Sequence, residues 1–130
     1  MTIVAFFATG AGAFFGACLR YALGLAFNTV FPTIPLGTLA ANLLGGLLMG
    51  LAMGLLTQLQ ALPPEMRLFI TTGFLGGLTT FSTFSAETMT LILRQEYLWS
   101  IAIIGLHLIG TLMMTALGLT VVRGLVRVWA

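Results

Sequence analysis

The sequence contains no lysine and no aspartate, and charged residues make up only 6% of its 130 positions. A soluble domain carries roughly 25% charged residues, so this chain has too few to cover a surface that faces water. Its mean hydropathy is +1.13, and 59% of its residues are hydrophobic. These values exclude an ordinary soluble domain. They indicate an integral membrane protein whose length fits a single domain, residues 1–130.

Cysteine and paired acids are also scarce. The one cysteine, Cys18, excludes an internal disulfide and a cysteine-based metal site. The chain offers no carboxylate pair for acid–base catalysis and no nucleophile backed by a base. We therefore expect no enzymatic activity. The net charge of +2 is too small to suggest a nucleic-acid partner.

Four apolar runs are long enough to cross a bilayer, which takes about 20 residues of helix. We expect transmembrane spans at residues 2–27, 37–59, 66–93 and 97–122. All four prolines fall between these runs, where residues that cannot continue a helix belong. The sequence therefore predicts an all-α integral membrane protein with four transmembrane helices.

The third run is too long for one straight span and contains the stretch GGLTTFSTFS, residues 76–85, with five hydroxyl side chains. Each glycine lowers helix stability by up to about 1 kcal/mol relative to alanine. Ser and Thr can bond backbone groups that a helix would otherwise pair. One interpretation is a helix broken near residues 76–80, whose freed backbone groups would surround a cavity or an ion. The alternative is an unbroken helix with a Ser/Thr-rich packing face.

Small residues recur every four positions along the first two runs. They are Ala8, Gly12 and Gly16 in the first run and Gly46, Gly50 and Gly54 in the second. Such stripes let helix backbones approach closely in lipid, so they predict helix packing. Because four helices bury little surface against one another, we also expect a homo-oligomer.

The arginines divide almost evenly between the two sides of the membrane. Arg67, Arg123 and Arg127 fall on the side of both termini, and Arg20 and Arg94 on the other. A three-to-two division gives almost no positive-inside bias. It favours insertion in both orientations and an antiparallel dimer. The alternative is a single orientation set by the C-terminal arginines.

Polar side chains on the second and fourth runs are functional candidates, because polar groups are expensive inside a membrane. Asn42 stands alone, with Thr38 one turn before it, and its amide either bonds a neighbouring helix or faces a water-filled path. His107, Thr111 and Thr115 are spaced by four, which places them on one helix face. We interpret them as a polar track that lines a water-accessible path. The alternative for the histidine is ordinary hydrogen-bonded packing.

Phe81 and Phe84 share one helix face within the hydroxyl-rich stretch. Such pairs usually serve core packing, but the electropositive edges of their rings can also face an anion. The hydroxyl donors beside them are Thr80, Ser82, Thr83 and Ser85. Glu87 is the one acid along this route. Arg20 either snorkels to the interface or collects anions at a vestibule. Together these groups predict a narrow route for a small anion.

The stretch GGLTTFSTFS resembles the Fluc family of fluoride channels, also called CrcB-like proteins. The segments GACLRYALG, GTLAANLLGG, TTGFLGGLTTFSTFS and HLIGTLMMTALG are similar to family segments and stand in family order, over essentially the whole chain. The resemblance implies an antiparallel, dual-topology homodimer with two fluoride pores in the bacterial inner membrane. It also implies a sodium ion at the dimer centre and passive export of cytoplasmic fluoride, which confers fluoride resistance.

The resemblance also implies roles for single residues. Phe81 and Phe84 look like the pore phenylalanines, Asn42 like the second-helix asparagine, and the carbonyls of Gly76 and Thr79 like the sodium ligands. The other matching positions are Arg20 in the vestibule, Thr38, Glu87, and the track His107, Thr111 and Thr115. Some family members carry Tyr and Ser along this track, where this chain has His and Thr.

Two other functions remain as alternatives. A small proton-coupled multidrug exporter needs an acid embedded in the membrane, whereas the first run has Arg20 and no acid. A membrane assembly subunit without transport activity would explain the packing glycines, but it would leave the aligned polar side chains without a purpose.

Overall fold

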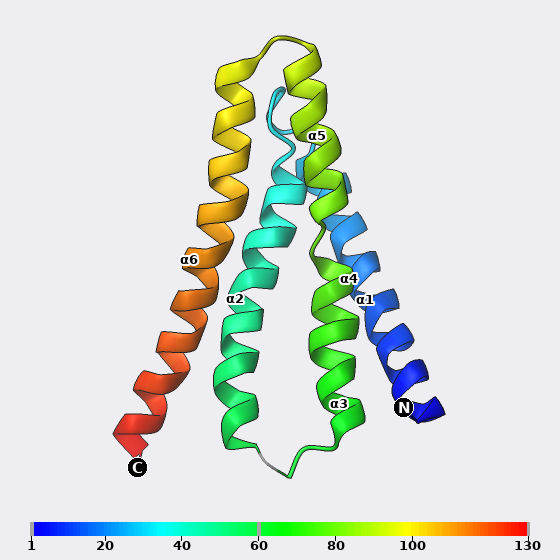
Figure 1. The fold of residues 1–130 in the computed structure, drawn as a ribbon, viewed down its shortest axis with the longest axis vertical. Coiled ribbons are helices and arrows are strands. Elements are labelled where there is room, and N and C mark those ends of the chain that lie inside the picture. Colours follow the sequence, from blue (N-terminus) through cyan, green and yellow to red (C-terminus); the bar gives the residue numbers. More distant parts are fainter. Residues whose placement is uncertain (1, 60, 130) are drawn as a thin grey trace.

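The computed structural model describes residues 2–59 and 61–129, and every regular element within them is helical. The elements are α1 (Ile3–Phe27), α2 (Leu36–Gln58), α3 (Pro64–Leu68), η1 (Phe69–Leu75), α4 (Gly76–Leu78), α5 (Phe81–Leu93) and α6 (Tyr97–Trp129). Figure 1 shows both termini and the α2–α3 connection at one end, and the α1–α2 and α5–α6 connections toward the other.

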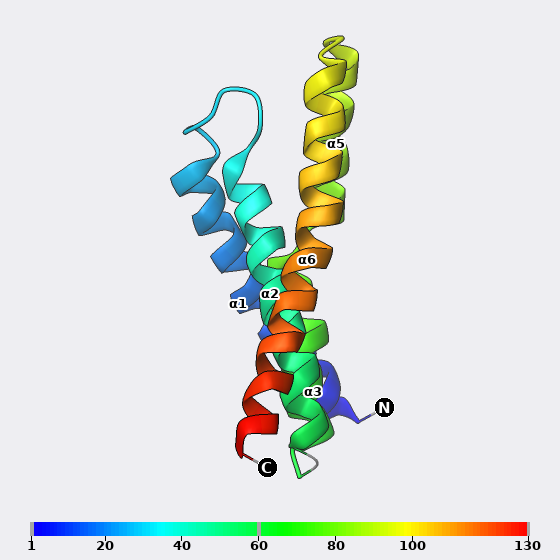
Figure 2. The same cartoon turned by 90° about the vertical axis from the view of Figure 1, so that its left-hand side faces the viewer.

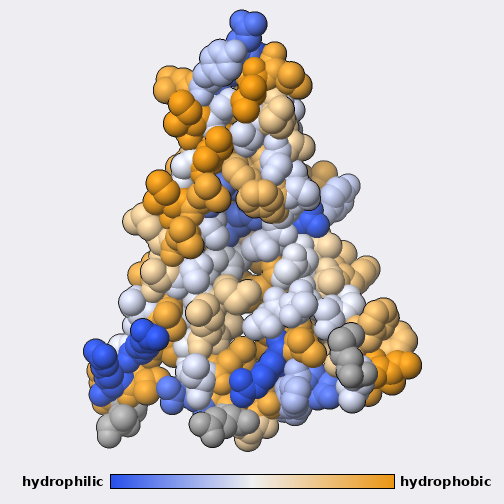
Figure 3. Space-filling view, in the orientation of Figure 1, coloured by the Kyte–Doolittle hydropathy of each residue, from blue (hydrophilic) through white to orange (hydrophobic). Residues whose placement is uncertain are grey.

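Three of the described helices, α1, α2 and α6, are long and apolar enough to cross a membrane. Most of the face seen in Figure 3 is apolar, and the strongest hydrophilic colour lies mainly at its two ends. The chain is therefore an integral, multi-pass helical membrane protein. The last helix continues past residue 122, where we expected it to end, because no proline or turn sequence interrupts it before Trp129.

The region expected to form the third span consists of several pieces. η1 is a π-helical segment, and the short α4 follows it directly. Thr79 and Thr80 then have extended backbones, with φ −80° and ψ 154° at Thr79 and φ −148° and ψ 114° at Thr80. α5 begins at Phe81, nearly in line with α4 in Figure 1. We call this two-residue interruption the break.

The glycine stripes lie in two helix–helix contacts, which we call the seams. In the α2–α6 seam, a Cβ added to Gly50 would strike the Thr115 carbonyl oxygen and come within 2.9 Å of Leu119 N. In the seam between α1 and η1, a Cβ on Gly12 would strike Phe69 O. Backbones that approach this closely leave no room for a side chain. The packing role predicted for these stripes is therefore confirmed.

Of the two glycines before the break, Gly77 serves packing, and neither has an unusual backbone conformation. None of the described glycines has a positive φ angle. A Cβ on Gly77 would come within 2.5 Å of Ala13 O in α1, whereas the nearest group to one on Gly76 is Thr71 O at 3.9 Å. Gly77 is therefore required for contact with α1. The space around Gly76 admits a methyl group, so packing does not require glycine at this position.

Arg67 closes the end of α2. Its guanidinium donates to Leu56 O at 3.0 Å, Leu59 O at 2.7 Å and Leu62 O at 3.3 Å. The last carbonyls of a helix have no partners within it, so a cation that donates several hydrogen bonds there stabilises the helix end. The turn into α3 is held by the same side chain.

The two ends of the molecule differ in how closely the helices gather. Figure 2 shows α5 and the first half of α6 as a pair that projects away from α1 and the start of α2. The break lies where these two halves separate. It is therefore bordered by helices on some sides only, which creates the cavities described next.

Candidate functional site

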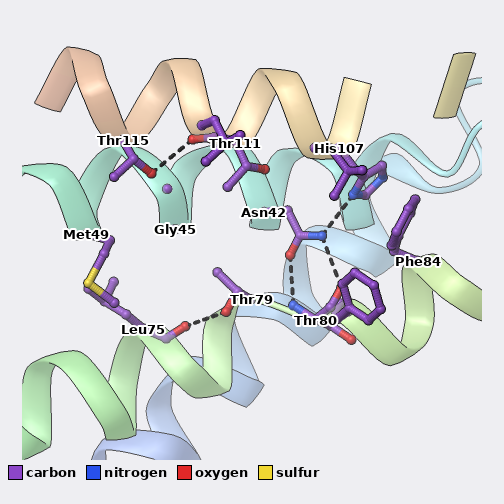
Figure 4. Close-up of a pocket in the computed structure, with 14 residues that line it drawn as sticks. Asn42, Gly45, Met49, Leu75, Thr79, Thr80, Phe84, His107, Thr111 and Thr115 are labelled. Atoms are coloured by element: carbon purple, nitrogen blue, oxygen red, sulfur yellow. Dashed lines mark hydrogen bonds between the residues drawn. The ribbon is translucent and has the colours of Figure 1, made fainter. Parts of the chain in front are cut away.

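Asn42 joins α2 to the break. The Thr80 N–H donates to Asn42 Oδ1 at 2.7 Å, and Asn42 Nδ2 donates to Thr80 O at 3.0 Å (Figure 4). Both residues are buried. The asparagine amide thus replaces the helical partners that Thr80 would have in a continuous helix, and the extended backbone keeps both its polar groups paired.

Two further side chains complete the backbone pairing around the break. Thr80 Oγ1 accepts a hydrogen bond from the Thr83 N–H at 3.1 Å, an N-cap that starts α5. Arg20, on α1, donates from Nε to Gly77 O at 3.0 Å. The arginine expected in a vestibule therefore also satisfies a carbonyl of the interrupted helix.

The same bonds leave two carbonyls without their helical donors. In a continuous helix, Gly76 O would accept from the Thr80 N–H and Thr79 O from the Thr83 N–H. Those two N–H groups instead donate to Asn42 Oδ1 and to Thr80 Oγ1. The carbonyls of Gly76 and Thr79 are the pair that the sequence resemblance singles out.

A cavity of about 390 Å³, which we call the central cavity, lies between the break, α2 and α6 (Figure 4). Its lining includes most of the predicted site: Asn42, Thr79, Thr80, Phe81, Phe84, His107, Thr111 and Thr115. Leucine and methionine side chains and the backbone of two glycines supply the remaining wall. The cavity is therefore mainly apolar, with polar groups from three separate segments facing one space.

The polar line of α6 faces the central cavity, as Figure 4 shows. His107 Nδ1 lies 2.8 Å from Asn42 Nδ2, which ties α6 to the break through α2. Thr115 Oγ1 donates to Thr111 O at 2.9 Å, so this hydroxyl hydrogen is already paired along its own helix. The three residues therefore share one cavity but differ in their free hydrogen-bonding capacity.

The two phenylalanines have opposite environments. Phe84 is 6% exposed and its ring stacks on His107, with centroids 4.7 Å apart. Phe81 is 71% exposed, although its ring meets that of Phe84 edge-to-face at 5.3 Å. Phe84 is thus part of the core of one chain, whereas Phe81 projects from the rim of the cavity.

A second cavity of about 480 Å³, the outer cavity, lies on the α1 side of the break. Arg20, Asn28, Thr38, Thr80 and Thr83 are among its lining residues. Thr80 is the one residue that borders both cavities. The sequence pattern suggested one continuous route, and the structure gathers the predicted residues around two spaces that meet at the break.

Four predicted residues line neither cavity: Gly76, Ser82, Ser85 and Glu87. Glu87 accepts a 2.6 Å hydrogen bond from Thr38 Oγ1. Ser82 Oγ lies 3.4 Å from Thr80 Oγ1. Glu87 and Ser82 each contact a residue that lines a cavity.

Sequence reasoning missed Asn28. Its Oδ1 accepts from Gly37 N at 2.8 Å and from Thr38 N at 3.2 Å, so it caps the start of α2 from the α1–α2 connection. Pro35, at the N-cap position, makes no such bond. Asparagine is a favoured capping residue, so its presence near the start of α2 is a signal for a cap. Because Asn28 lies nine positions before Gly37, however, no local capping pattern reveals this hydrogen bond.

These features are typical of a membrane channel or transporter. Uncharged donors and one arginine surround a helix break inside a multi-pass membrane protein. Within the described residues, no group of acids, histidines or cysteines could hold a metal through side chains. Irregular backbone at membrane depth is tolerated where it lines a cavity, and in channels and transporters this is where solutes bind.

Comparison with known proteins gives the family. The profile of the family described as "CrcB-like protein, Camphor Resistance (CrcB)" matches residues 7–119. A protein of Nitrosospira multiformis named "Fluoride-specific ion channel FluC" is 57% identical over 96% of this chain and 98% of its own length. Relatives with the same name from Burkholderia ambifaria and Burkholderia vietnamiensis are 55% and 56% identical, over 94% and 91% of this chain and 93% and 90% of their own lengths. The chain belongs to the CrcB-like family.

Proposed function

We propose that this protein is a fluoride-selective channel of the bacterial inner membrane, which lets cytoplasmic fluoride leave passively and so confers resistance. The observation that carries this proposal is the 57% identity to a fluoride-specific channel over nearly the full length of both chains. The residues of the central cavity agree with it, because amide, imidazole and hydroxyl groups meet there beside two phenylalanine rings.

The chemistry of the cavity suits a small anion. Uncharged donors in a narrow space replace the hydration shell of a small ion better than that of a larger one, so we expect fluoride to pass and chloride to be excluded. A membrane potential drives one charge with about 2.3 kcal/mol per 100 mV, so a negative interior expels the anion without an energy source. A proton-coupled exporter would need an acid that this cavity does not contain.

The proposed channel has four spans, the third of them interrupted. The segments α3, η1, α4 and α5 together run from Pro64 to Leu93. They connect the end that carries the α2–α3 turn with the end that carries the α5–α6 turn. The break supports an interruption at membrane depth, since Asn42 pairs the N–H and C=O of Thr80 and Arg20 pairs the nearby Gly77 carbonyl.

The active form that we propose is an antiparallel homodimer of chains inserted in both orientations. The near-even division of arginines supports dual insertion. The exposure of Phe81 supports a partner chain, because a second chain packed over this ring would close the rim of the central cavity. Two such chains would carry two pores.

A sodium ion at the dimer centre is part of the same proposal. The carbonyls of Gly76 and Thr79 fit such an ion, because both have lost their helical donors and carbonyl oxygen is a ligand for hard cations. An unpaired carbonyl in an apolar setting costs several kcal/mol. The cation would satisfy these oxygens and lower the barrier to a passing anion.

The direct test is flux from liposomes that contain the purified protein. We expect a fluoride electrode to record efflux that needs no ATP and no proton gradient, and expect chloride efflux to be far slower. Equal fluoride and chloride fluxes would refute the proposed selectivity.

Two single variants test the pore. Phe81→Ile and Phe84→Ile keep apolar bulk and remove the electropositive ring edge. Each should lower fluoride flux by at least about tenfold, roughly 1.4 kcal/mol of barrier, while chromatography still shows a dimer. Unchanged flux in both variants would return the rings to a packing role. The proposed sodium ion is tested separately, by measuring fluoride flux in sodium-free N-methylglucamine medium before and after sodium is restored. We expect flux to depend on sodium, and flux that is indifferent to sodium would contradict the proposed ion.

A further inference from the structure

The backbone determines the orientation of the Asn42 amide. The Thr80 N–H can only donate, so the atom 2.7 Å from it must be the oxygen Oδ1. The Thr80 carbonyl can only accept, so the atom 3.0 Å from it must be the nitrogen Nδ2. A flipped amide would place the Asn42 NH₂ group against the Thr80 N–H, donor to donor, and the Asn42 oxygen against the Thr80 carbonyl, acceptor to acceptor. The assignment therefore does not depend on the placement of hydrogens.

This orientation decides the tautomer of His107. Asn42 Nδ2 carries two hydrogens, one of which goes to Thr80 O. The second points to His107 Nδ1 at 2.8 Å, which must therefore be the unprotonated, accepting nitrogen. In the neutral ring the proton is then on Nε2. Both amide hydrogens of Asn42 are used, and none is left for a solute.

The Nε2–H is the free donor of this group. Within the described residues His107 Nε2 is buried and has no hydrogen-bond partner, and the whole side chain is only 4% exposed. A buried donor without a partner is unfavourable, so this N–H favours any acceptor that can reach it. Phe84 stacks on the same imidazole, and both rings border the central cavity.

We propose that Asn42 is a positioning residue that holds the break and sets the His107 tautomer, and that His107 Nε2–H is the donor that contacts the permeating anion. This inference rests on the proposed function. Of the two alternatives that the sequence left for the Asn42 amide, it favours a bond to neighbouring segments over a place facing a water-filled path. Phe84 stacks on the face of this imidazole, and both rings line the central cavity, where an anion would supply the partner that Nε2–H lacks.

The single histidine of the chain makes the tautomer measurable. Protein labelled with ¹⁵N-histidine gives imidazole resonances from His107 alone. In the absence of fluoride we expect a protonated Nε2 and an unprotonated Nδ1. Fluoride should shift the Nε2 resonance and its proton, while chloride at the same concentration leaves them unchanged. A proton on Nδ1, or no response of Nε2 to fluoride, would overturn the proposal.

Two variants separate donation from structure. His107→Gln can accept from Asn42 through its side-chain oxygen and donate through its nitrogen, so it should retain most of the flux. His107→Leu removes both roles and should lower flux by at least about tenfold, which corresponds to roughly 1.4 kcal/mol of barrier. Dimer content and thermal stability are measured on both. Wild-type flux in a folded His107→Leu dimer would exclude the donor role.

The outcomes distinguish this inference from the proposed function. If the wild-type protein conducts fluoride but the His107 resonances do not respond, the channel assignment stands and the donor assignment fails. If the wild-type protein does not conduct, the proposed function fails. The tautomer measured without fluoride then still decides whether Asn42 sets the histidine.

Discussion

The α2–α6 seam and the break before α5 bring chain segments together by opposite means. At the seam, Gly50 has no side chain, so the backbone of α2 lies directly against Thr115 and Leu119. At the break, the backbone N–H and C=O of Thr80 form no helical hydrogen bond and are paired instead by the side chain of Asn42. The seam depends on the absence of a side chain at Gly50, whereas the break depends on the presence of the Asn42 amide.

The difference shows how a chain with few polar residues can maintain an irregular backbone inside a membrane. Apolar close packing satisfies no hydrogen bond, so each polar group released at the break needs its own partner. Asn42 and Arg20 reach across from α2 and α1 to supply two of these partners. The seams can accept no added atom, whereas the break should tolerate changes of volume better than losses of hydrogen bonds.

Loss of the Asn42 amide should have the largest effect. Asn42→Leu leaves the N–H and C=O of Thr80 unpaired, at roughly 1–3 kcal/mol for each group. We expect a marked fall in the unfolding midpoint in detergent titrated with SDS, together with loss of fluoride flux. Asn42→Asp keeps the acceptor for the Thr80 N–H and, in its protonated form, a donor for Thr80 O, so its loss of stability should be smaller. Equal stability of the leucine variant and the wild type would show that the break does not need this bond.

Filling the seam should come next. Gly50→Ala places a methyl group against the Thr115 carbonyl, and overpacking of this kind typically costs about 1–3 kcal/mol. The same SDS titration should show the loss, because α2 and α6 must separate to admit the group. A variant as stable as the wild type would mean that the two backbones are farther apart than described.

Removal of the arginine cap should have a moderate effect. Arg20→Met keeps the apolar stem but leaves Gly77 O without its donor, at about 1 kcal/mol for a half-buried group that water partly reaches. Arg20→Lys retains a charged donor and should restore part of the stability. If both variants unfold like the wild type while both lose flux, Arg20 acts on the anion and not on the break.

The smallest effect is expected at a glycine outside the seams. A Cβ on Gly105 in α6 would meet no atom within 4 Å. Gly105→Ala should therefore change stability by at most about 1 kcal/mol, in the stabilising direction, because alanine favours helix. It is the matched control for Gly50→Ala. A loss as large as that of Gly50→Ala would place a partner chain against this face.

Several features follow from the sequence alone, since they depend on composition and local spacing. The scarcity of charge and the four apolar runs determine that the chain lies in a membrane, because lipid admits few ions. The glycines spaced by four lie where helices touch, because residues at that spacing share a helix face. The break was one of two readings of residues 76–85, and Thr79 and Thr80 have the extended backbone that this reading requires.

Other features arise only in the tertiary structure, because their partners are far apart in the chain. Asn42 is separated from Thr80 by 38 positions and from His107 by 65, and Arg20 from Gly77 by 57. No local pattern encodes such pairs, so the amide of Asn42 could be read equally as a solute donor or a helix contact. The opposite exposures of Phe81 and Phe84 have the same origin. Residues three apart share a helix face, but the neighbouring helices decide which of the two rings is covered.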